Sequence, residues 1–351
     1  MEYRRLGRTD LKVSVICLGT MTYGEQNTQA EGHEQMDYAL DQGVNFFDTA
    51  EMYSIPPKAE TQGSTERIIG NWFKARGNRD KVILASKVVG RGTSDWLRDD
   101  KGPTRVTRKQ IFEAVDKSLA RLQTDYIDLY QIHFPERPMP WGSNPTRFSK
   151  AAFEKPADET PIAEQLDAFA EVIKAGKIRH LGLSNESAWG TMSFLRDSET
   201  RGGPRVQSIQ NAYSLLNRTF DTALAEVAIR EDVGLLAYSP LAQGFLTGKY
   251  LDGARPAGAR TTLFNRAQRY ETAGAEDAIK RYVALAREAG LDPAQMALAF
   301  VNSRSFVTAN IIGATKMDQL KTDIASIGVT LSSELEAKID AIHQLVGNPC
   351  P

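Results

Sequence analysis

The chain has 351 residues, of which 41% are hydrophobic and 25% charged, values typical of a globular protein with a large buried core. Its 43 basic and 44 acidic residues nearly cancel, so we expect no nucleic-acid partner, since such binders carry a basic excess or stripe. Two cysteines, Cys17 and Cys350, no apolar signal segment and no apolar run of ~18 residues predict a cytoplasmic protein that does not contact a membrane.

In chain order, the first predicted element is a small β-hairpin, with strands at residues 3–6 and 12–14, that could plug the floor of a barrel. After it, short apolar runs alternate with longer amphipathic ones, as buried parallel strands alternate with helices. The short runs predict strands at residues 16–18, 44–48, 82–86, 127–131, 178–183, 208–211, 234–238 and 309–312. The long runs predict helices at residues 29–42, 65–76, 109–122, 163–175, 187–198, 220–231, 276–289 and 317–327, with extra helices at 293–303 and 332–345.

Strand followed by helix, eight times over, predicts a parallel α/β fold. Eight units in about 310 residues fit a closed (β/α)8 TIM barrel, and an open doubly wound sheet is the alternative. The chain contains no linker, so we expect residues 1–351 to form a single domain. Long loops at residues 54–64, 89–106 and 134–160 follow strands, and such loops carry the catalytic face of a barrel.

Four polar residues lie at or just past predicted strand ends, which converge on one rim of a barrel: Asp48, Tyr53, Lys87 and His133. Reducing a carbonyl requires a hydride and a proton, and a tyrosine with its ordinary pKa near 10 is a reluctant donor. A lysine ammonium ~4 Å away would lower that pKa by roughly three units before desolvation opposes it. Asp48 could keep Lys87 charged, and His133 could orient the carbonyl oxygen.

Each of these residues also has a purely structural interpretation. Asp48 could be a helix cap, Lys87 a solvated rim residue, His133 a core histidine and Tyr53 a packing residue. Their joint placement after consecutive strands favours a site. A barrel glycosidase is a further alternative, because it needs two carboxylates, but we expect Glu51 near Asp48 to be a solvated loop residue.

Five runs, in order along nearly the whole chain, resemble the aldo-keto reductase superfamily. They are LGTM at 18–21, DTAEMY at 48–53, DYIDLYQIH at 125–133, GLSN at 182–185 and YSPL at 238–241. The resemblance is closest to the bacterial Tas-like group, with potassium-channel β subunits as relatives. It implies NADPH-dependent reduction of a small carbonyl substrate, with Asp48, Tyr53, Lys87 and His133 as the catalytic tetrad. A cofactor-binding regulatory subunit with slight turnover is the alternative function.

The resemblance also implies an NADP(H) site across the barrel mouth. The nicotinamide end is assigned to Thr20, Met21, Asp48, Ser184, Asn185, Gln210 and the stacking residue Tyr238. The pyrophosphate loop is assigned to Ser239, Pro240, Leu241, Gln243, Gly244 and Lys249. The adenosine end is assigned to Arg266, Gly313, Thr315, Lys316, Gln319 and Asp323. We expect Arg266 and Lys316 to favour NADPH over NADH, although Thr322-Asp323 departs from the Glu-Asn that relatives often carry.

Other motifs are absent or weak. No G-x-G-x-x-G run follows a strand, and residues 244–250 resemble a Walker loop but are one residue short. The four histidines are scattered, so we expect no metal site. Since the long loops should build the substrate pocket, its candidate walls are Tyr23, Met52, Trp96 and Trp141.

Overall fold

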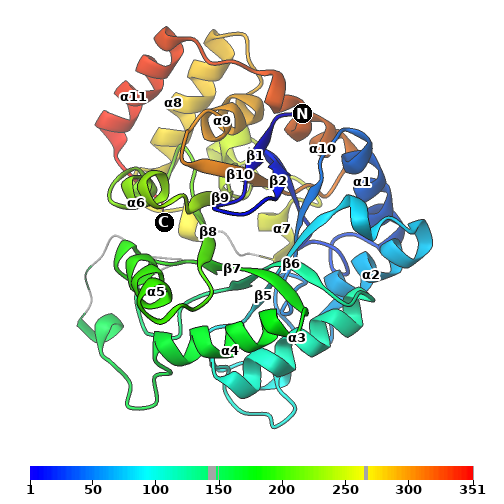
Figure 1. The fold of residues 1–351 in the computed structure, drawn as a ribbon. Coiled ribbons are helices and arrows are strands. Elements are labelled where there is room, and N and C mark those ends of the chain that lie inside the picture. Colours follow the sequence, from blue (N-terminus) through cyan, green and yellow to red (C-terminus); the bar gives the residue numbers. More distant parts are fainter. Residues whose placement is uncertain (141–147, 149, 265–267, 351) are drawn as a thin grey trace.

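The computed structural model describes residues 1–140, 148, 150–264 and 268–350 of the chain. Eight parallel strands close into a barrel in the order β10-β3-β4-β5-β6-β7-β8-β9, as Figure 1 shows. These strands are β3 (Ile16–Gly19), β4 (Phe46–Asp48), β5 (Ile83–Val88), β6 (Ile127–Ile132), β7 (Ile178–Ser184), β8 (Val206–Ala212), β9 (Gly234–Tyr238) and β10 (Val307–Ile312). The predicted TIM barrel is therefore confirmed, and the open sheet is excluded.

Helices surround the barrel and connect its strands (Figure 1). They are α1 (Gln29–Asp41), α2 (Ser64–Arg76), α3 (Arg108–Leu122), α4 (Ile162–Lys174), α5 (Ala188–Arg201), α6 (Leu224–Glu231), α7 (Arg260–Phe264), α8 (Ala275–Glu288), α9 (Pro293–Asn302), α10 (Met317–Ala325) and α11 (Ser333–Val346). The predicted helix at 220–231 begins late, because Ala223 has a φ of 59° and Phe220 lies in a separate 3-10 turn. The short helix α7 was not predicted.

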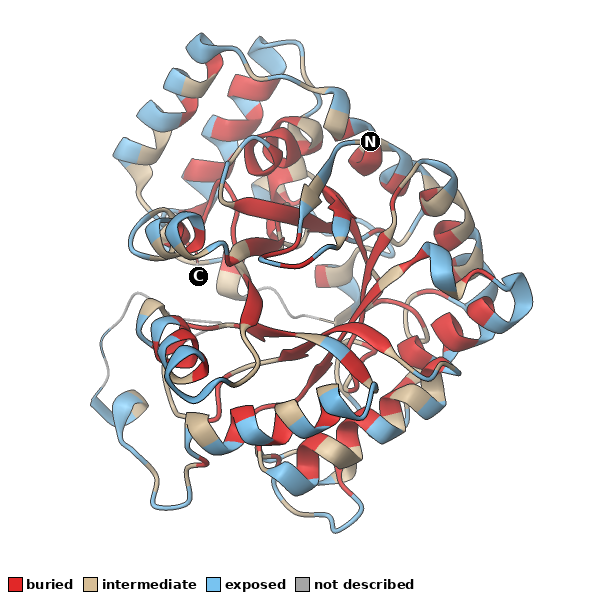
Figure 2. Cartoon of the chain, in the orientation of Figure 1, coloured by how far each residue is buried: buried red, intermediate tan, exposed pale blue. Residues whose placement is uncertain are grey.

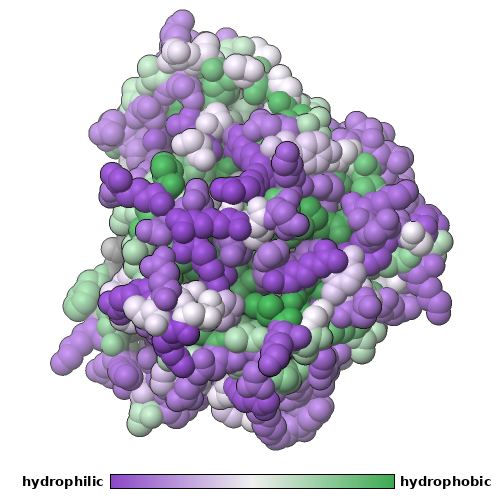
Figure 3. Space-filling view, viewed as in Figure 1, coloured by the Kyte–Doolittle hydropathy of each residue, from purple (hydrophilic) through white to green (hydrophobic). Residues whose placement is uncertain are grey.

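The floor of the barrel is closed by the predicted hairpin, β1 (Tyr3–Arg5) and β2 (Lys12–Ser14). Leu6 and Val13 from this hairpin are fully buried with Cys17 and other apolar side chains of the lower barrel interior. Figure 2 shows how buried residues concentrate in the strands and on the inner sides of the helices. Hydrophilic residues predominate on the hairpin face of the molecule (Figure 3). The floor is thus an apolar plug, and the opposite end of the barrel is the place for polar chemistry.

Candidate active site

A fully buried lysine lies at the centre of the barrel mouth. Lys87 lies near the end of β5, and Asp48 is the last residue of β4. The Nζ atom of Lys87 donates a hydrogen bond to Asp48 Oδ2 at 2.6 Å. The same Nζ donates to the carbonyl oxygen of Thr49 at 2.8 Å and lies 3.5 Å from Tyr53 Oη. Because an unpaired buried charge is costly, this arrangement stabilises Lys87 as an ammonium directly beside the phenol.

The fourth predicted residue, His133, joins this group from the end of β6. Its ring contacts the Tyr53 ring edge to face, with 5.6 Å between the centroids. Burial lowers the pKa of His133 well below its ordinary range, and the nearby Lys87 ammonium adds to this effect. Its Nδ1 atom is buried and has no hydrogen-bond partner among the described residues. A neutral imidazole can donate one hydrogen bond, which suits a carbonyl oxygen placed beside it.

The pKa of Tyr53 is shifted opposite to our expectation. Burial raises it above 10, Lys87 opposes this rise, and Asp48 adds to it. Tyr53 is only 8% exposed, and the Lys87 charge beside it is shared with the closer carboxylate of Asp48. Burial alone would lower the pKa of Lys87, but Asp48 and Tyr53 raise it. In this state, Tyr53 therefore keeps its proton at neutral pH and can act as a donor.

Two buried amides hold the second oxygen of Asp48. Gln210 on β8 donates from Nε2 to Asp48 Oδ1 at 2.8 Å, and Gln131 on β6 donates to the same atom at 3.3 Å. Gln210 also donates to Gln131 Oε1 at 3.2 Å. We did not predict a role for Gln131, although its place two residues before His133 in an inward-facing register signals it. The amides fix Asp48 so that its other oxygen faces Lys87.

The residues expected to hold nicotinamide lie at the ends of β7, β8 and β9. Asn185 Nδ2 donates to the carbonyl oxygen of His133 at 2.8 Å, and Tyr238 Oη donates to Asn185 Oδ1 at 2.7 Å. Asn185 has a φ of 53°, in the left-handed region that asparagine adopts more readily than most residues other than glycine. The side chain of Asn211, also missed from sequence, fixes this turn through both backbone groups of Glu186, at 3.0 and 2.9 Å.

Three further predicted residues border this end of the site. Ser184 Oγ donates to the carbonyl oxygen of Gln210 at 2.8 Å. Thr20 is buried and donates from Oγ1 to the carbonyl oxygen of Asp48 at 2.8 Å. Met21 follows it at the rim and is half-buried. The predicted catalytic residues are therefore hydrogen-bonded to residues that we expect to hold nicotinamide.

The predicted pyrophosphate loop has an unusual backbone. Residues with positive φ are concentrated in it: Ser239, Ala242, Gln243, Gly244 and Gly248. Turns of this kind can direct successive N–H groups to one side and so bind anions. The φ of 93° favours glycine at position 244, and a Cβ atom there would lie 2.8 Å from Lys249 Nζ, so the lysine side chain would have to move.

The other predicted residues of that loop lie in less polar surroundings. Pro240 is buried and Leu241 packs against the main core. The Oε1 atom of Gln243 is buried without a partner in the described structure. This amide oxygen needs a donor, which a diphosphate does not offer, so the half-buried Lys249 ammonium is the group of this loop that suits a diphosphate.

At the expected adenosine end, Gly313, Lys316 and Gln319 are exposed at the start of α10. The backbone N–H and Oγ1 of Thr315 donate to Gln319 Oε1 at 3.0 and 3.2 Å. A helix N-terminus with a lysine beside it is a favourable place for a phosphate group. Arg266 lies outside the described residues.

Asp323 is 3% exposed within α10. Burial raises its pKa to about 8, with Asp292 contributing and Lys249 opposing. Much of its negative charge is therefore lost near neutral pH, which weakens the repulsion of a phosphate that its sequence position suggested.

The residues predicted to line the substrate pocket differ in how far they are buried. Tyr23 is fully buried in the main core, where its hydroxyl donates to Gln35 at 3.1 Å, so it does not line an open pocket. Met52 and Trp96 are half-buried, and the Nε1 atom of Trp96 has no partner in the described part of the chain. Trp141 lies outside the described residues.

The expectation that Glu51 is solvated is wrong. It is 1% exposed and forms two hydrogen bonds of 2.8 Å with the guanidinium of Arg98. A carboxylate held in this way is not positioned as the second acid of a glycosidase.

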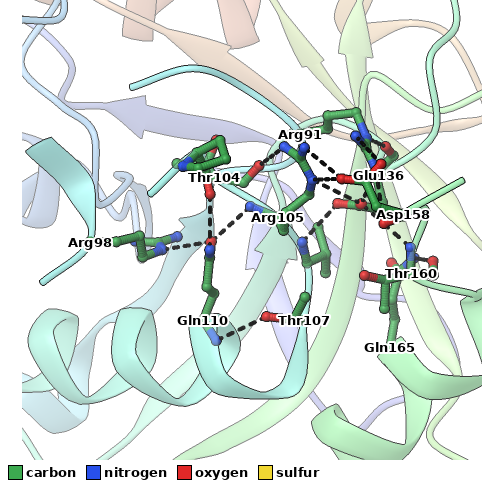
Figure 4. Close-up of polar contacts among 12 residues, drawn as sticks. Arg91, Arg98, Thr104, Arg105, Thr107, Gln110, Glu136, Asp158, Thr160 and Gln165 are labelled. Carbon is green, nitrogen blue, oxygen red and sulfur yellow. Dashed lines mark hydrogen bonds and ion pairs between the residues drawn. The ribbon is translucent and has the colours of Figure 1, made fainter. Parts of the chain in front are cut away.

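Two of the long loops are joined by an ion network at the barrel rim. Figure 4 shows Arg91 and Arg105 directed toward Glu136 and Asp158. Glu136 is 2% exposed and accepts from Arg91 at 2.9 Å and from the backbone N–H of Val106 at 2.8 Å. Arg105 reaches Asp158 at 2.9 Å. The loop at 89–106 is thereby joined to Glu136 and Asp158 beside the mouth.

Two searches of the described residues gave no further site. No group of three His, Cys, Asp or Glu side chains there is arranged to hold a metal ion. None of the described helices combines the length and apolar character that crossing a membrane requires.

Known proteins are similar to this chain over its whole length. A profile of the aldo/keto reductase family matches residues 15–344. The chain is 50% identical over 355 residues to Protein tas of Escherichia coli (strain K12), covering 100% of both chains. It is 34% identical over 354 residues to "Uncharacterized oxidoreductase YrpG" of Bacillus subtilis, covering 100% of this chain and 98% of that one. A probable voltage-gated potassium channel subunit beta of Arabidopsis thaliana is 30% identical over 341 residues, which cover 94% of this chain and 92% of the relative. These matches confirm the resemblance inferred from the five motifs.

Proposed function

The chain belongs to the aldo/keto reductase family, and we propose that it reduces aldehydes or ketones to alcohols with NADPH. Members of this family are oxidoreductases and typically use nicotinamide cofactors. One observation carries the proposal. A buried Lys87 lies between Asp48 at 2.6 Å and the hydroxyl of Tyr53 at 3.5 Å, in the mouth of the barrel.

The four residues divide the proton chemistry among them. Tyr53 holds at Oη the proton that the new alcohol oxygen receives. The Lys87 ammonium stabilises the phenolate that remains, and Asp48 keeps Lys87 charged. His133, neutral because of its lowered pKa, orients the substrate oxygen by donating one hydrogen bond. A reduced nicotinamide, when bound, supplies the hydride.

The residues around the mouth fit that cofactor. Gln210, Ser184 and Asn185 would face the amide of nicotinamide, and Tyr238 would cover one face of its ring. The loop with positive φ at Gln243 and Gly244, with Lys249 against it, would face the diphosphate. At the other end, we propose that Lys316 and Arg266 interact with the 2′-phosphate and favour NADPH over NADH.

NADPH oxidation by the purified protein, measured across a panel of aldehydes, ketones and quinones, tests this function. We expect consumption of NADPH with at least one carbonyl class and formation of one alcohol per NADPH. Tight NADPH binding with no turnover on any member of the panel would contradict it. The location in the cytoplasm and the single domain over residues 1–351 stay predictions.

A second function is suggested by the relatives named as potassium channel β subunits. In that case the chain would bind the cofactor as a regulatory subunit with slight turnover. The close grouping of Asp48, Tyr53, Lys87 and His133 favours the enzyme. The same panel distinguishes the two, since a regulatory subunit would bind NADPH with little or no consumption.

A further inference from the structure

The segment that carries Tyr53 is not a free loop. Thr49 and Glu51 continue the pairing of β4 with β5 beyond the end of the strand, through hydrogen bonds to the carbonyl oxygens of Ala85 at 2.9 Å and Lys87 at 3.3 Å. The N–H of Tyr53 then donates to the carbonyl oxygen of Ala50 at 3.1 Å. Tyr53 is therefore two residues beyond a point where its chain is tied to the Lys87 peptide.

Glu51 uses every polar group it has at this point. While its N–H bonds to the carbonyl of Lys87, its Oε1 accepts from the N–H of Val89 at 2.8 Å. Glu51 therefore binds the backbone on both sides of Val88, the last residue of β5: the carbonyl of Lys87 and the N–H of Val89. Its own carbonyl accepts from Gln62 Nε2 at 2.6 Å.

The charge of Glu51 is balanced by Arg98, from the loop at 89–106. Arg98 is 1% exposed and donates from both terminal nitrogens to the carboxylate at 2.8 Å. Its Nε donates at 3.0 Å to Gln110 Oε1 at the start of α3, a contact that Figure 4 shows. A bidentate pair of this kind fixes direction as well as distance. Through Arg98 the proton-donor segment is fastened to a loop on the substrate side.

We propose that Glu51 is a positioning residue that sets the distance and angle between Tyr53 and Lys87, with Arg98 holding it in place. The inference rests on the proposed function, in which Tyr53 donates the proton. Glu51 itself touches neither Tyr53 nor Lys87 Nζ through its side chain in any contact of the described structure, so its effect passes through the backbone it clamps.

The chain offers a matched control for the loss of a buried carboxylate. Glu66 on α2 is also fully buried, accepts from Arg121 at 2.7 Å and from Ser86 Oγ at 2.6 Å, and makes no side-chain contact with the 48–53 segment. Glu51→Gln and Glu66→Gln each leave an arginine without its charge partner: Arg98, whose side chain is 0% exposed, and Arg121, whose side chain is 13% exposed. Their effects on folding should be similar, whereas only Glu51→Gln should disturb the donor.

The test compares kcat, the KM of the carbonyl and the Kd of NADPH in the wild type and both variants. We expect Glu51→Gln to lower kcat by about ten- to a hundredfold, since a small misplacement of a reacting group has an effect of this size. The Kd of NADPH should stay within about twofold, because the hydrogen bonds of the Glu51 side chain are to Val89 and Arg98, neither of which is assigned to the cofactor. Equal losses of kcat in Glu51→Gln and Glu66→Gln would overturn the proposal.

A double variant guards against misfolding. Glu51→Gln with Arg98→Met removes both charges and the cost of an unpaired arginine, so its melting temperature should recover relative to Glu51→Gln alone. Its kcat should stay low, because the clamp on Val89 is still weakened. Full recovery of kcat in the double variant would show that only the unpaired charge mattered, and would overturn the proposal.

A spectroscopic measurement separates this inference from the proposed function. The Cζ signal of Tyr53, labelled with ¹³C and assigned by its loss in Tyr53→Phe, reports the surroundings of the phenol without any turnover. It should move in Glu51→Gln and not in Glu66→Gln. If the wild type reduces no carbonyl, the proposed function fails, and this signal still decides on Glu51: an unchanged signal overturns its positioning role.

Discussion

The two ends of the barrel interior are filled in opposite ways. At the floor, Leu6 and Val13 of the hairpin meet Cys17 and Phe46 in an apolar plug. At the mouth, the same strands bury ionised and amide side chains: Asp48, Lys87, Gln131 and Gln210. Apolar burial stabilises a fold directly, whereas buried charges cost free energy unless they are paired and hydrogen-bonded. Burial at the floor thus stabilises the fold, whereas the paired charges at the mouth form the site that we propose for catalysis.

The largest effect should follow from breaking the mouth at its centre. Lys87→Met removes the ammonium that stabilises the phenolate of Tyr53 and leaves Asp48 unpaired. We expect carbonyl reduction at neutral pH to fall by about a hundredfold, and the free energy of unfolding to fall by about 3–5 kcal/mol at most, less if Asp48 takes up a proton. Steady-state kinetics and denaturant unfolding measure the two effects. An unchanged pH–rate profile would show that Lys87 is not coupled to the donor.

The complementary change belongs to the floor. Leu6→Ala empties part of a fully buried plug and should cost about 2–5 kcal/mol in the free energy of unfolding. Below the melting transition, kcat and the Kd of NADPH should stay within about twofold of the wild type, because the site lies at the other end of the barrel. Denaturant titration and kinetics on the same preparation give both numbers. A large loss of kcat in the folded variant would break the division between the two ends.

A third change concerns the outer edge of the mouth. Arg266→Ala should weaken the binding of NADPH by about ten- to a hundredfold, which is the effect of losing a hydrogen bond to a charged group. NADH should bind almost as before, since it lacks the 2′-phosphate. Fluorescence titration of both cofactors measures this, with Lys316→Ala as the second cation. Equal losses for NADH and NADPH would show that Arg266 does not recognise the phosphate.

The smallest effect is in the pH dependence of stability. The pKa of His133 is lowered on folding, so the folded state resists protonation while the unfolded state takes up a proton below about 6.5. Stability from neutral His133 is thus present above pH 6.5 and is lost as pH falls from there toward the folded pKa. The slope should be up to ~1.4 kcal/mol per pH unit, and His133→Asn should remove it. Leu6→Ala should keep the wild-type slope, and an equal slope in His133→Asn would contradict this assignment.

Much of the fold could be predicted from the sequence because its signals are local. Short apolar runs between amphipathic stretches predicted the eight strands and the hairpin, and the ends of those strands predicted that Asp48, Lys87 and His133 would meet. The start of α6 was wrong because the positive φ of Ala223 is not visible in an apolar pattern.

The parts that failed depend on partners distant in sequence. We expected Glu51 to be a solvated loop residue, because its partner Arg98 is 47 residues away in the sequence. We expected Tyr23 to line the substrate pocket, because no residue next to it in the sequence indicates the hydrogen bond to Gln35. The pKa of Tyr53 was expected to fall because the charge of Lys87 was weighed before the degree of burial was known. Burial is a property of the assembled fold, so its competition with charge could be decided only in the structure.

Tyr53→Phe tests most directly the proposal that Tyr53 donates the proton to the substrate. The ring stays, so packing against His133 and the binding of NADPH should be preserved, while only the transferable proton is lost. Carbonyl reduction and NADPH affinity should be measured on the same preparation of wild type and variant. We expect the rate to fall to about a hundredth of the wild type or less, since a general acid contributes about 10²–10⁴-fold, with NADPH affinity nearly unchanged. A variant that binds NADPH normally and keeps more than this rate would show that the proton comes from another group.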